Sequence, residues 1–267
     1  MRIEMWADVA NPWTHVAAER LRVVLSAADV VAEVVWRPLL TDPADPDAAR
    51  DALRLLLLAE ERGGVDVQAR VAAGLLAALD VRDPAELAAV AERAGFPEGG
   101  RLLADEGAGR ARLRELLLIG KARGITVSPT LAIGDRLLEF VASPAAIGEF
   151  LSEPADPDAR VLPEEVQRLR WAEELVALSD PLGALVLLEP LQAEHGQDPN
   201  IRRVAASAYF ASAQLGRARA VLEAMLADNP ADAYARLMLG RTLKRQGRAE
   251  EAGVHLRMAA AMTPDYA

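Results

Sequence analysis

The chain of 267 residues contains no cysteine. This absence excludes disulfide bonds, thiolate nucleophiles and cysteine-ligated metals within the chain. Aromatic residues make up only 4% of the sequence while hydrophobic residues make up 52%, so aliphatic side chains are expected to form the core. Lysine occurs only at Lys121 and Lys244. The formal net charge is −10 and no long basic run is present, which argues against nucleic acid as a partner.

Long apolar segments are also lacking. Apolar runs such as Leu55–Ala59 are far too short to span a bilayer, and the segment Met1–Trp6 has the pattern of a strand rather than of a signal sequence. A cytoplasmic protein without a membrane partner is therefore expected. The three histidines, His15, His195 and His255, stand far apart in the sequence, so neither a metal site nor a cofactor is expected.

The length favours two domains, and the first part of the chain mixes strand and helix patterns. A buried strand is expected over 2–9, a helix from Asn11-Pro12 to about 27, and a second, parallel strand over 31–37. After a turn-rich link at 41–47, helices are expected over 48–62, 65–79, 84–94 and 107–123. Two short strands around Gly134-Asp135 then predict a hairpin, 129–133 and 137–141, before a last helix over 144–151.

This order resembles the DsbA-like branch of the thioredoxin superfamily, most closely its FrnE-like subgroup. The resemblance covers roughly residues 1–152 and rests on four segments: Glu4-Met-Trp-Ala-Asp8, Asn11-Pro-Trp-Thr14, Trp36-Arg-Pro-Leu-Leu-Thr-Asp-Pro43 and Gly124-Ile-Thr-Val-Ser-Pro-Thr130. It implies an α/β thioredoxin-like fold with a large helical insertion at about 45–123. Asn11 and Thr14 would then occupy the two cysteine positions of the family's Cys-x-x-Cys corner, and Pro129 would be its cis-proline.

The resemblance makes Asn11, Thr14, His15 and Pro129 a degenerate corner with no catalytic residue. Backbone amides at the start of the helix still favour an anion or thiolate near Asn11. The alternative is that Asn11 only caps the helix. Thr14 has no neighbouring base that would make it a nucleophile. His15 either flanks the corner as a hydrogen-bond donor or packs partly buried against the fold. Glu60 and Glu61 are interpreted as solvated residues.

The second part of the chain contains a 34-residue repeat. Setting 199–232 against 233–266 aligns small and apolar residues: Ala206 with Gly240, Tyr209 with Leu243, Ala218 with Ala252, Leu222 with Leu256, Met225 with Ala259 and Pro230 with Pro264. This resembles the tetratricopeptide repeat (TPR), whose small residues let paired helices approach closely. A partial earlier copy begins near Pro163. An all-α TPR solenoid of about two and a half to three repeats is expected over 164–267, after a Pro- and Asp-rich linker over 153–163.

The TPR resemblance places the first helix of each pair along a peptide-binding groove. The groove residues are Asn200, Arg203, Val204, Ser207, Phe210, Tyr234, Leu237, Met238, Arg241, Lys244 and Arg245. Arg241, Lys244, Arg245 and Arg248 share one helix face and predict attraction for an acidic or C-terminal peptide. The alternative is a solvated basic face that offsets Glu250 and Glu251. Leu237 is apolar, so the family's carboxylate-binding set is incomplete.

No polar capping helix follows the second full repeat in this sequence. Leu256, Ala259, Ala260 and Met262 are therefore expected to pack against the first domain or a second subunit, and a homodimer is the hypothesis.

Together these features predict a redox-inactive DsbA-like protein whose TPR domain acts as a protein-binding adaptor or chaperone-like holdase. A dithiol-disulfide oxidoreductase is excluded by composition. The alternative is a thiol-cofactor-dependent isomerase or transferase of the kappa type, in which Asn11 would donate a hydrogen bond to the cofactor's thiolate.

Overall fold

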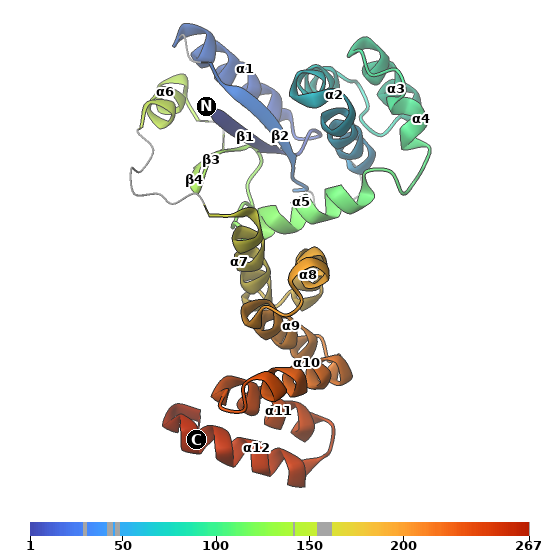
Figure 1. Ribbon diagram of the computed structural model, residues 1–267. Coiled ribbons are helices and arrows are strands. Elements are labelled where there is room, and N and C mark those ends of the chain that lie inside the picture. Colours follow the sequence, from blue (N-terminus) through green and yellow to red (C-terminus); the bar gives the residue numbers. More distant parts are fainter. Residues whose placement is uncertain (29–30, 42–44, 46–48, 141, 154–161, 267) are drawn as a thin grey trace. The chain divides into compact units, whose positions relative to one another are not determined.

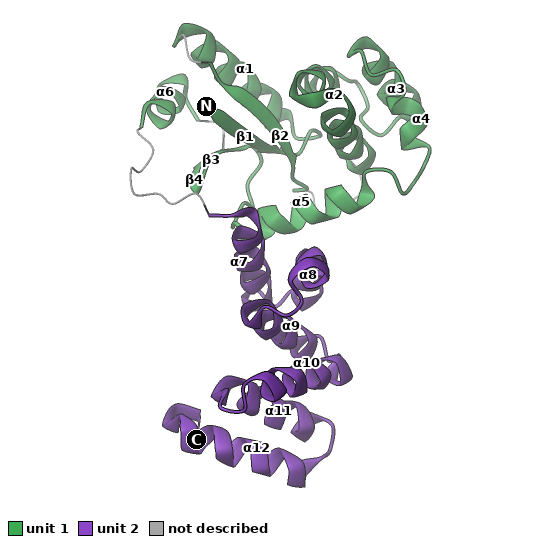
Figure 2. Cartoon of the chain, in the orientation of Figure 1, with its two compact units in different colours: residues 1–159 green, residues 160–267 purple. Residues whose placement is uncertain are grey.

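The structure is a computed structural model that describes residues 1–28, 31–41, 45, 49–140, 142–153 and 162–266. The chain divides into two compact units, residues 1–159 and 160–267, coloured separately in Figure 2. Each unit has its own set of buried residues. The predicted link at 41–47 and the predicted linker at 153–163 fall mostly outside the described residues. Where the structure describes the chain, none of its helices combines the length and the apolar character needed to cross a membrane.

The first unit is a mixed sheet with helices around it (Figure 1). The sheet has the strand order β2-β1-β3-β4. β1 pairs in parallel with β2, while β3 is antiparallel to both β1 and β4. The elements are β1 (Arg2–Ala7), α1 (Pro12–Ala27), β2 (Glu33–Pro38), α2 (Arg50–Leu76), α3 (Pro84–Arg93), α4 (Gly99–Leu103), α5 (Arg110–Ala122), β3 (Thr130–Ile133), β4 (Arg136–Glu139) and α6 (Pro144–Ser152).

This topology is the predicted thioredoxin-like fold with inserted helices. α1 connects the parallel pair β1 and β2, as a parallel connection requires. The helices α2 to α5 lie between β2 and β3 in the sequence, and α2 and α5 contact β2. β3 and β4 form the predicted hairpin, in which Ile133 pairs with Arg136 and Gly134 adopts a left-handed φ of 59°. The starts of α1 and β3 therefore come from segments that are distant in the sequence but adjacent to the same strand, β1.

Several predicted boundaries differ from those observed. The helices expected at 48–62 and 65–79 form one kinked element, α2, because Gly64 alone leaves helical geometry with a φ of 77°. That element ends at Leu76, three residues before the predicted end. The five-residue helix α4 was not predicted, since it is too short to show a helical period. α5 begins at Arg110 rather than at 107, after a left-handed Gly109.

A charged cluster beside the sheet corrects one expectation. Glu60 is not solvated: it accepts two hydrogen bonds from the guanidinium of Arg37, at 2.8 and 3.0 Å, and Arg37 is buried. Glu4 also contacts Arg37, at 3.3 Å, and accepts a 2.6 Å bond from Arg123. Burial raises the pKa of the Glu4 carboxyl, but the hydrogen bond and charge of Arg123 and the charge of Arg37 hold it below its ordinary value of 4.5. The cluster therefore links β1, β2, α2 and the end of α5.

The second unit consists, in its described part, of helices arranged in consecutive pairs (Figure 1). The pairs are α7 (Glu164–Ala177) with α8 (Pro181–His195), α9 (Pro199–Ala211) with α10 (Leu215–Asp228), and α11 (Ala233–Arg245) with α12 (Ala249–Met262), followed by a short 3-10 turn, Pro264–Tyr266. Each pair turns at a residue with a left-handed φ: Ser179 at 60°, Ala213 at 60° and Gly247 at 80°. Successive turns are 34 residues apart. The pair α7 and α8 therefore follows the same 34-residue period as the repeats at 199–232 and 233–266.

Small residues allow the paired helices of this unit to approach closely. A Cβ on Gly240 of α11 would lie 2.7 Å from the side chain of Leu256 on α12, closer than real contacts allow. The equivalent Ala206 on α9 is fully buried, as are Leu222 and Ala252. These contacts agree with the small-residue role that the TPR resemblance implies.

Candidate functional site

The first candidate site is the corner where β1 leads into α1. Asn11 caps the helix: its side-chain oxygen accepts a hydrogen bond from the amide of Trp13, at 3.0 Å. The side-chain nitrogen of Asn11 donates to the carbonyl of Ser128, at 3.3 Å. Both polar atoms of the Asn11 side chain are thus used within the protein. The cap and Pro12 at the first helical position form as the sequence predicts.

A buried polar network lies directly beneath this cap. Thr14, which is fully buried, donates a hydrogen bond to the carbonyl of Asp8 at 2.8 Å. Its hydroxyl also lies 3.3 Å from the hydroxyl of Ser128. Ser128 in turn accepts a bond from the amide of Asp8, at 2.9 Å, and Asp8 accepts two bonds from Thr41. Thr14 stands at the position of the second cysteine in the Cys-x-x-Cys pattern. Its hydroxyl belongs to a hydrogen-bond network that joins the start of α1, the end of β1 and the loop before β3.

The sequence reasoning missed Asp8 and Ser128 as members of this site. Both stand inside segments that carry the family resemblance, Ser128 directly before Pro129 and Asp8 at the end of the first strand. The Ser128–Pro129 peptide bond is cis, as the resemblance implied. The carbonyl of Pro129 accepts a hydrogen bond from the amide of Phe140, at 2.8 Å.

The rim of the corner is exposed and partly aromatic. Trp13 is 53% exposed and Phe140 58% exposed, and their ring centroids are 6.4 Å apart. His15 is exposed, so it does not pack partly buried as the alternative prediction held. Asn11 and His15 line one side of a groove of about 350 Å³, and the loop at 78–82 lines the other. The groove is large enough for a side chain or a small ligand.

No thiol exists in the chain, and the one buried hydroxyl of α1, on Thr14, has neither a histidine nor a lysine as a hydrogen-bond partner. Within the described ranges, no group of three or more His, Asp or Glu side chains is arranged to hold a metal ion.

The second candidate site is the face formed by α9 and α11. The hydroxyls of Ser207 and Tyr234 lie 2.5 Å apart, and the guanidinium of Arg203 lies over the Tyr234 ring, 5.0 Å from its centroid. Arg245 lies over the Phe210 ring at 4.6 Å and donates to the Phe210 carbonyl at 2.7 Å. Cation–π contacts of this kind hold arginine side chains flat against aromatic rings. The structure thus brings these five predicted groove residues into two contacting groups, one around the Tyr234 ring and one around the Phe210 ring.

The other predicted groove residues divide into buried and exposed groups. Val204, Leu237 and Met238 are buried in the core of the unit, so their side chains are not available on its surface. Asn200, Arg241 and Lys244 are exposed. Arg248, which the basic stripe also included, is neutralised by two hydrogen bonds to Glu251, at 2.5 and 2.7 Å.

Arg241 and Lys244 differ from the other cations of this face. Neither has a hydrogen-bond or ion-pair partner among the residues whose placement is described. Their charges face solvent on the same helix as Tyr234, at positions i and i+3. The face therefore offers two uncompensated positive charges and, in addition, two aromatic rings that are already covered by arginines.

Comparisons with known proteins match each unit separately. The sequence profile of the tetratricopeptide repeat matches residues 211–267. The structure is similar to a probable DsbA oxidoreductase from Streptomyces coelicolor, with a TM-score of 0.48 and 21% sequence identity, over 61% of this chain and 99% of that chain. A search of curated proteins finds no match.

The strand order, the cis-proline before β3 and the helices between β2 and β3 define the first unit, and the 34-residue helix pairs define the second. The first unit thus has a thioredoxin-like topology without cysteine, and the second consists of helix pairs of which residues 211–267 match the tetratricopeptide repeat.

Proposed function

We propose that this protein is an adaptor or holdase that binds polypeptides through the α9–α11 face and carries out no redox chemistry. The face selects acidic segments of a client, because its uncompensated groups are cations. The thioredoxin-like unit then serves as a second contact surface or as a scaffold. Tetratricopeptide repeats are protein-interaction modules, which supports a role in binding other proteins.

The observation that carries this proposal is the pair of unpartnered cations, Arg241 and Lys244, on the helix that also carries Tyr234. An exposed arginine or lysine without a carboxylate partner loses no ion pair when an acidic ligand binds. Arg203 and Arg245 are held on aromatic rings and so present their remaining N–H groups in fixed directions. A face of this kind suits an extended acidic peptide, with the two free cations providing attraction and the two fixed arginines providing orientation.

Fluorescence anisotropy of the full chain with a labelled decapeptide of alternating Asp, Glu and Leu tests the proposal. Charge reversal of Arg241→Glu together with Lys244→Glu is expected to weaken binding by about tenfold or more, with the largest loss at low salt. The matched control reverses Arg93 and Arg101, two exposed arginines of the first unit, and changes the net charge by the same amount.

Equal losses in the two variants would mean that the peptide responds only to net charge, and the α9–α11 face would then not be the binding site. Absence of binding to the unaltered chain would reject the acidic-peptide proposal. Holdase activity is measured separately, as suppression of aggregation of a chemically unfolded acidic protein. The charge-reversed variant is expected to lose this suppression while the control variant keeps it.

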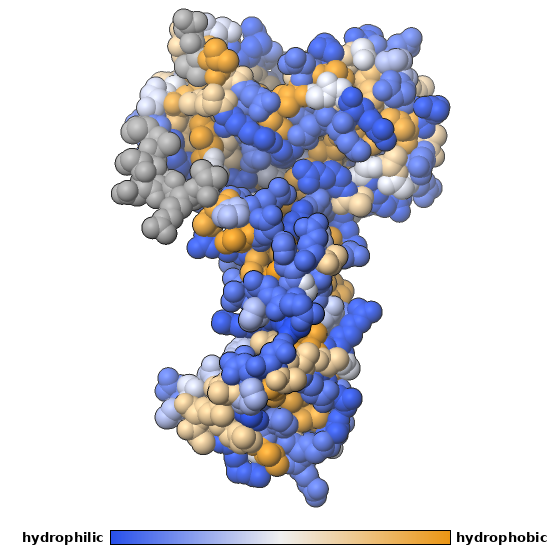
Figure 3. Space-filling view, viewed as in Figure 1, coloured by the Kyte–Doolittle hydropathy of each residue, from blue (hydrophilic) through white to orange (hydrophobic). Residues whose placement is uncertain are grey.

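A homodimer forms part of the same proposal. Val254, Met258 and Met262 are exposed on α12 at i, i+4 and i+8, which places them on one face of the helix. Figure 3 shows mildly to strongly hydrophobic residues gathered at this end of the second unit. Ala259, which was expected to face a partner, is instead buried inside the unit. Light scattering that shows a strict monomer at micromolar concentration would reject the dimer.

A second candidate function is the binding of a small thiol in the groove beside Asn11 and His15. The side-chain oxygen of Asn11 accepts from the Trp13 amide and one N–H of its side-chain amide donates to the Ser128 carbonyl, which leaves a single N–H of Asn11 for a thiolate. Calorimetry of the full chain with glutathione is expected to give no heat of binding. Saturable heat that disappears in a His15→Ala variant would favour the thiol-cofactor function instead.

A further inference from the structure

The chain is poor in lysine, and its two lysines differ in their surroundings. Arginine provides all but two of the 30 basic side chains, and the exceptions are Lys121 and Lys244. Both are exposed. Lys121, near the end of α5, interacts with another residue, whereas Lys244, in the last turn of α11, has no partner in the described part of the chain. The amine of Lys244 is therefore the more accessible of the two.

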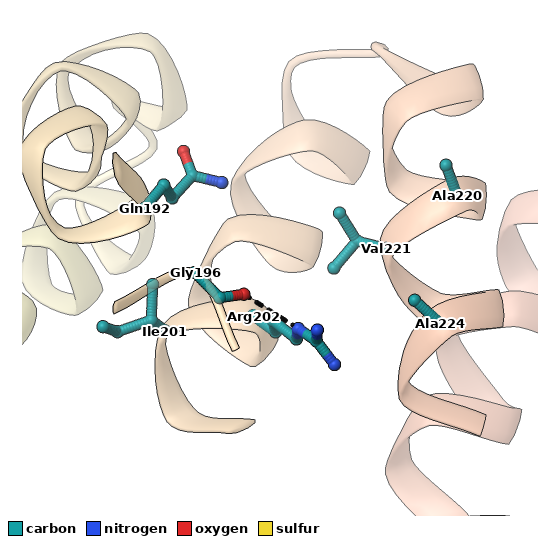
Figure 4. A pocket seen from close by; sticks show the side chains of 7 residues that line it. All are labelled: Gln192, Gly196, Ile201, Arg202, Ala220, Val221 and Ala224. Carbon is teal, nitrogen blue, oxygen red and sulfur yellow. Dashed lines mark hydrogen bonds between the residues drawn. The ribbon is translucent and has the colours of Figure 1, made fainter. Parts of the chain in front are cut away.

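The arginines at the junctions between helix pairs are used for packing. Figure 4 shows Arg202 donating to the carbonyl of Gly196, a bond of 2.9 Å from Nε, and its guanidinium also pairs with Asp228. Arg236, 34 residues later, makes the same kind of bond from Nε to the carbonyl of Pro230, at 3.0 Å. These guanidinium groups hold neighbouring segments together, so they do not offer a free charge to a ligand.

Arg241 and Lys244 form an exposed cationic pair on α11. Residues at i and i+3 lie on one face of a helix, with Cβ atoms about 5–6 Å apart. The two side chains differ in chemistry. A guanidinium stays protonated in proteins, whereas an ammonium group can release a proton and become a nucleophile. The pair therefore joins a group that binds anions to an amine that can be acylated.

The charge of this face selects the class of acyl donor. An acyl phosphate carries its negative charge on the phosphoryl group, next to the reactive carbonyl carbon. Because a guanidinium binds phosphoryl oxygens through two parallel N–H bonds, Arg241 is suited to hold that group while the amine of Lys244 faces the carbonyl. Arg245, the next residue, is held on the Phe210 ring and adds positive charge to the same end of α11. An uncharged acyl donor gains nothing from these cations.

We infer that Lys244 is a site of acylation by an acyl phosphate and that Arg241 positions the donor. The neutral amine of Lys244 attacks the carbonyl carbon and a C–N bond forms. The C–O bond to the phosphoryl group breaks, and inorganic phosphate leaves with the bonding electrons and takes up the amine proton. The product is an uncharged amide. Its consequence rests on the proposed function: acylation removes one of two uncompensated cations and so weakens the binding of acidic segments to the α9–α11 face.

The site is tested on the full chain with acetyl phosphate at low salt and mildly alkaline pH, with both lysines followed over time by peptide mass spectrometry. Lys244 is expected to be acetylated about threefold faster than Lys121, or more. Arg241→Gln is expected to slow acetylation of Lys244 by acetyl phosphate to a similar extent, but not acetylation by acetic anhydride, which is uncharged. The matched control, Arg93→Gln, removes an exposed arginine of the first unit and is expected to change neither rate.

Two outcomes of this reaction would overturn the inference. Equal rates at Lys121 and Lys244 would reject the site. Equal slowing with both donors in Arg241→Gln would reject the positioning of the donor by its charge. The reaction contains no peptide, so its result does not depend on whether the face binds acidic segments.

The consequence for binding is measured by anisotropy with the acidic decapeptide. Acetylation of Lys121→Arg, in which Lys244 is the remaining lysine, is expected to weaken peptide binding about two- to fivefold. Lys244→Gln lacks that charge from the start and is expected to lose no further affinity on the same treatment. Unchanged affinity after acetylation of Lys244 would overturn the regulation. Absence of peptide binding before any treatment would reject the proposed function and the regulation with it, while the acetylation rates still decide the site.

Discussion

Removal of the Ser128 hydroxyl is the perturbation that tests the buried network at the corner most directly. In the structure the Ser128 hydroxyl oxygen accepts a hydrogen bond from the amide of Asp8 at 2.9 Å and lies 3.3 Å from the Thr14 hydroxyl. Asp8, Thr14 and Ser128 are all nearly inaccessible to solvent. Ser128→Ala leaves the Asp8 amide without its acceptor in a place that water does not reach.

The expected cost follows from that unsatisfied group. A buried donor that loses its partner costs about 1–3 kcal/mol, so Ser128→Ala is expected to lower the free energy of unfolding by about 2 kcal/mol. Thr14→Val is expected to cost less, about 1 kcal/mol. The reason is that the Asp8 carbonyl, which loses the Thr14 hydroxyl, still accepts the amide of Asn11 at 3.1 Å.

Denaturant unfolding followed by tryptophan fluorescence measures these differences. Of the four tryptophans, Trp6, Trp13 and Trp36 belong to the first unit, so the signal reports mainly on the unit that contains the network. A constant denaturant slope would show that only stability has changed. Ser26→Ala is the matched control. Ser26 is exposed, lies on α1 as Thr14 does, and donates a hydrogen bond to the Arg22 carbonyl.

The control is expected to change stability by less than about 0.5 kcal/mol. If Ser128→Ala is as mild as Ser26→Ala, the hydroxyl does not satisfy the Asp8 amide and the reasoning fails. A larger loss of unfolding free energy in Thr14→Val than in Ser128→Ala would also refute the assignment, in which the Ser128 hydroxyl accepts from the Asp8 amide and the Thr14 hydroxyl donates to the Asp8 carbonyl.

Three further perturbations test other parts of the molecule. Glu4→Gln removes the carboxylate that Arg123 contacts and is expected to cost roughly 2 kcal/mol in urea unfolding at neutral pH. Because the folded-state pKa of Glu4 is depressed, this stabilisation is present above its ordinary value of 4.5 and shrinks as the pH falls through and below it. Ala213→Gly relieves a left-handed backbone and is expected to stabilise the second unit by about 0.5–1 kcal/mol in thermal unfolding, whereas Gly247→Ala is expected to destabilise it by about 1 kcal/mol. Asn11→Cys places one thiol at the start of α1, where its pKa, measured by alkylation rate against pH, is expected below the ordinary value of about 8.5.

Each of these has its own control and contrary result. Identical pH dependence in the Glu4 variant and the unaltered chain would contradict the role of that carboxylate. Ala227→Gly, inside α10, is expected to destabilise, so a loss of stability at both alanines would refute the argument from the left-handed turn. Ser26→Cys, in the last turn of α1, is the reference thiol. Equal pKa values at the two thiols would mean that the helix start no longer favours an anion.

The local features of this protein could be predicted from sequence because their causes are local. The cap at Asn11, the proline at the first turn of α1 and the Gly134 hairpin depend on residues within a few positions of one another. The TPR period was visible because the same small and apolar residues return after 34 positions. The resemblance to the DsbA-like branch located the cis-proline, which spacing alone does not indicate.

The candidate sites were less predictable, because they depend on contacts between distant segments. The groove prediction included Val204 and Met238, which the packing of α9 and α11 buries. Helical position gives the face on which a side chain lies, but whether that face is covered depends on the neighbouring pair. Glu60 was interpreted as solvated for the same reason: its partner, Arg37, belongs to another element.

The sequence by itself determined that the chain carries no thiol of its own, that a strand–helix–strand unit precedes a helical repeat, and that the corner begins with an asparagine cap. These properties are set by composition, by period and by neighbours along the chain. Only the tertiary structure decided that Thr14 and Ser128, 114 residues apart, share a buried network and that Arg245 covers Phe210, 35 residues away. Such contacts arise when elements pack, and the residues that make them carry no mark of it in their local sequence.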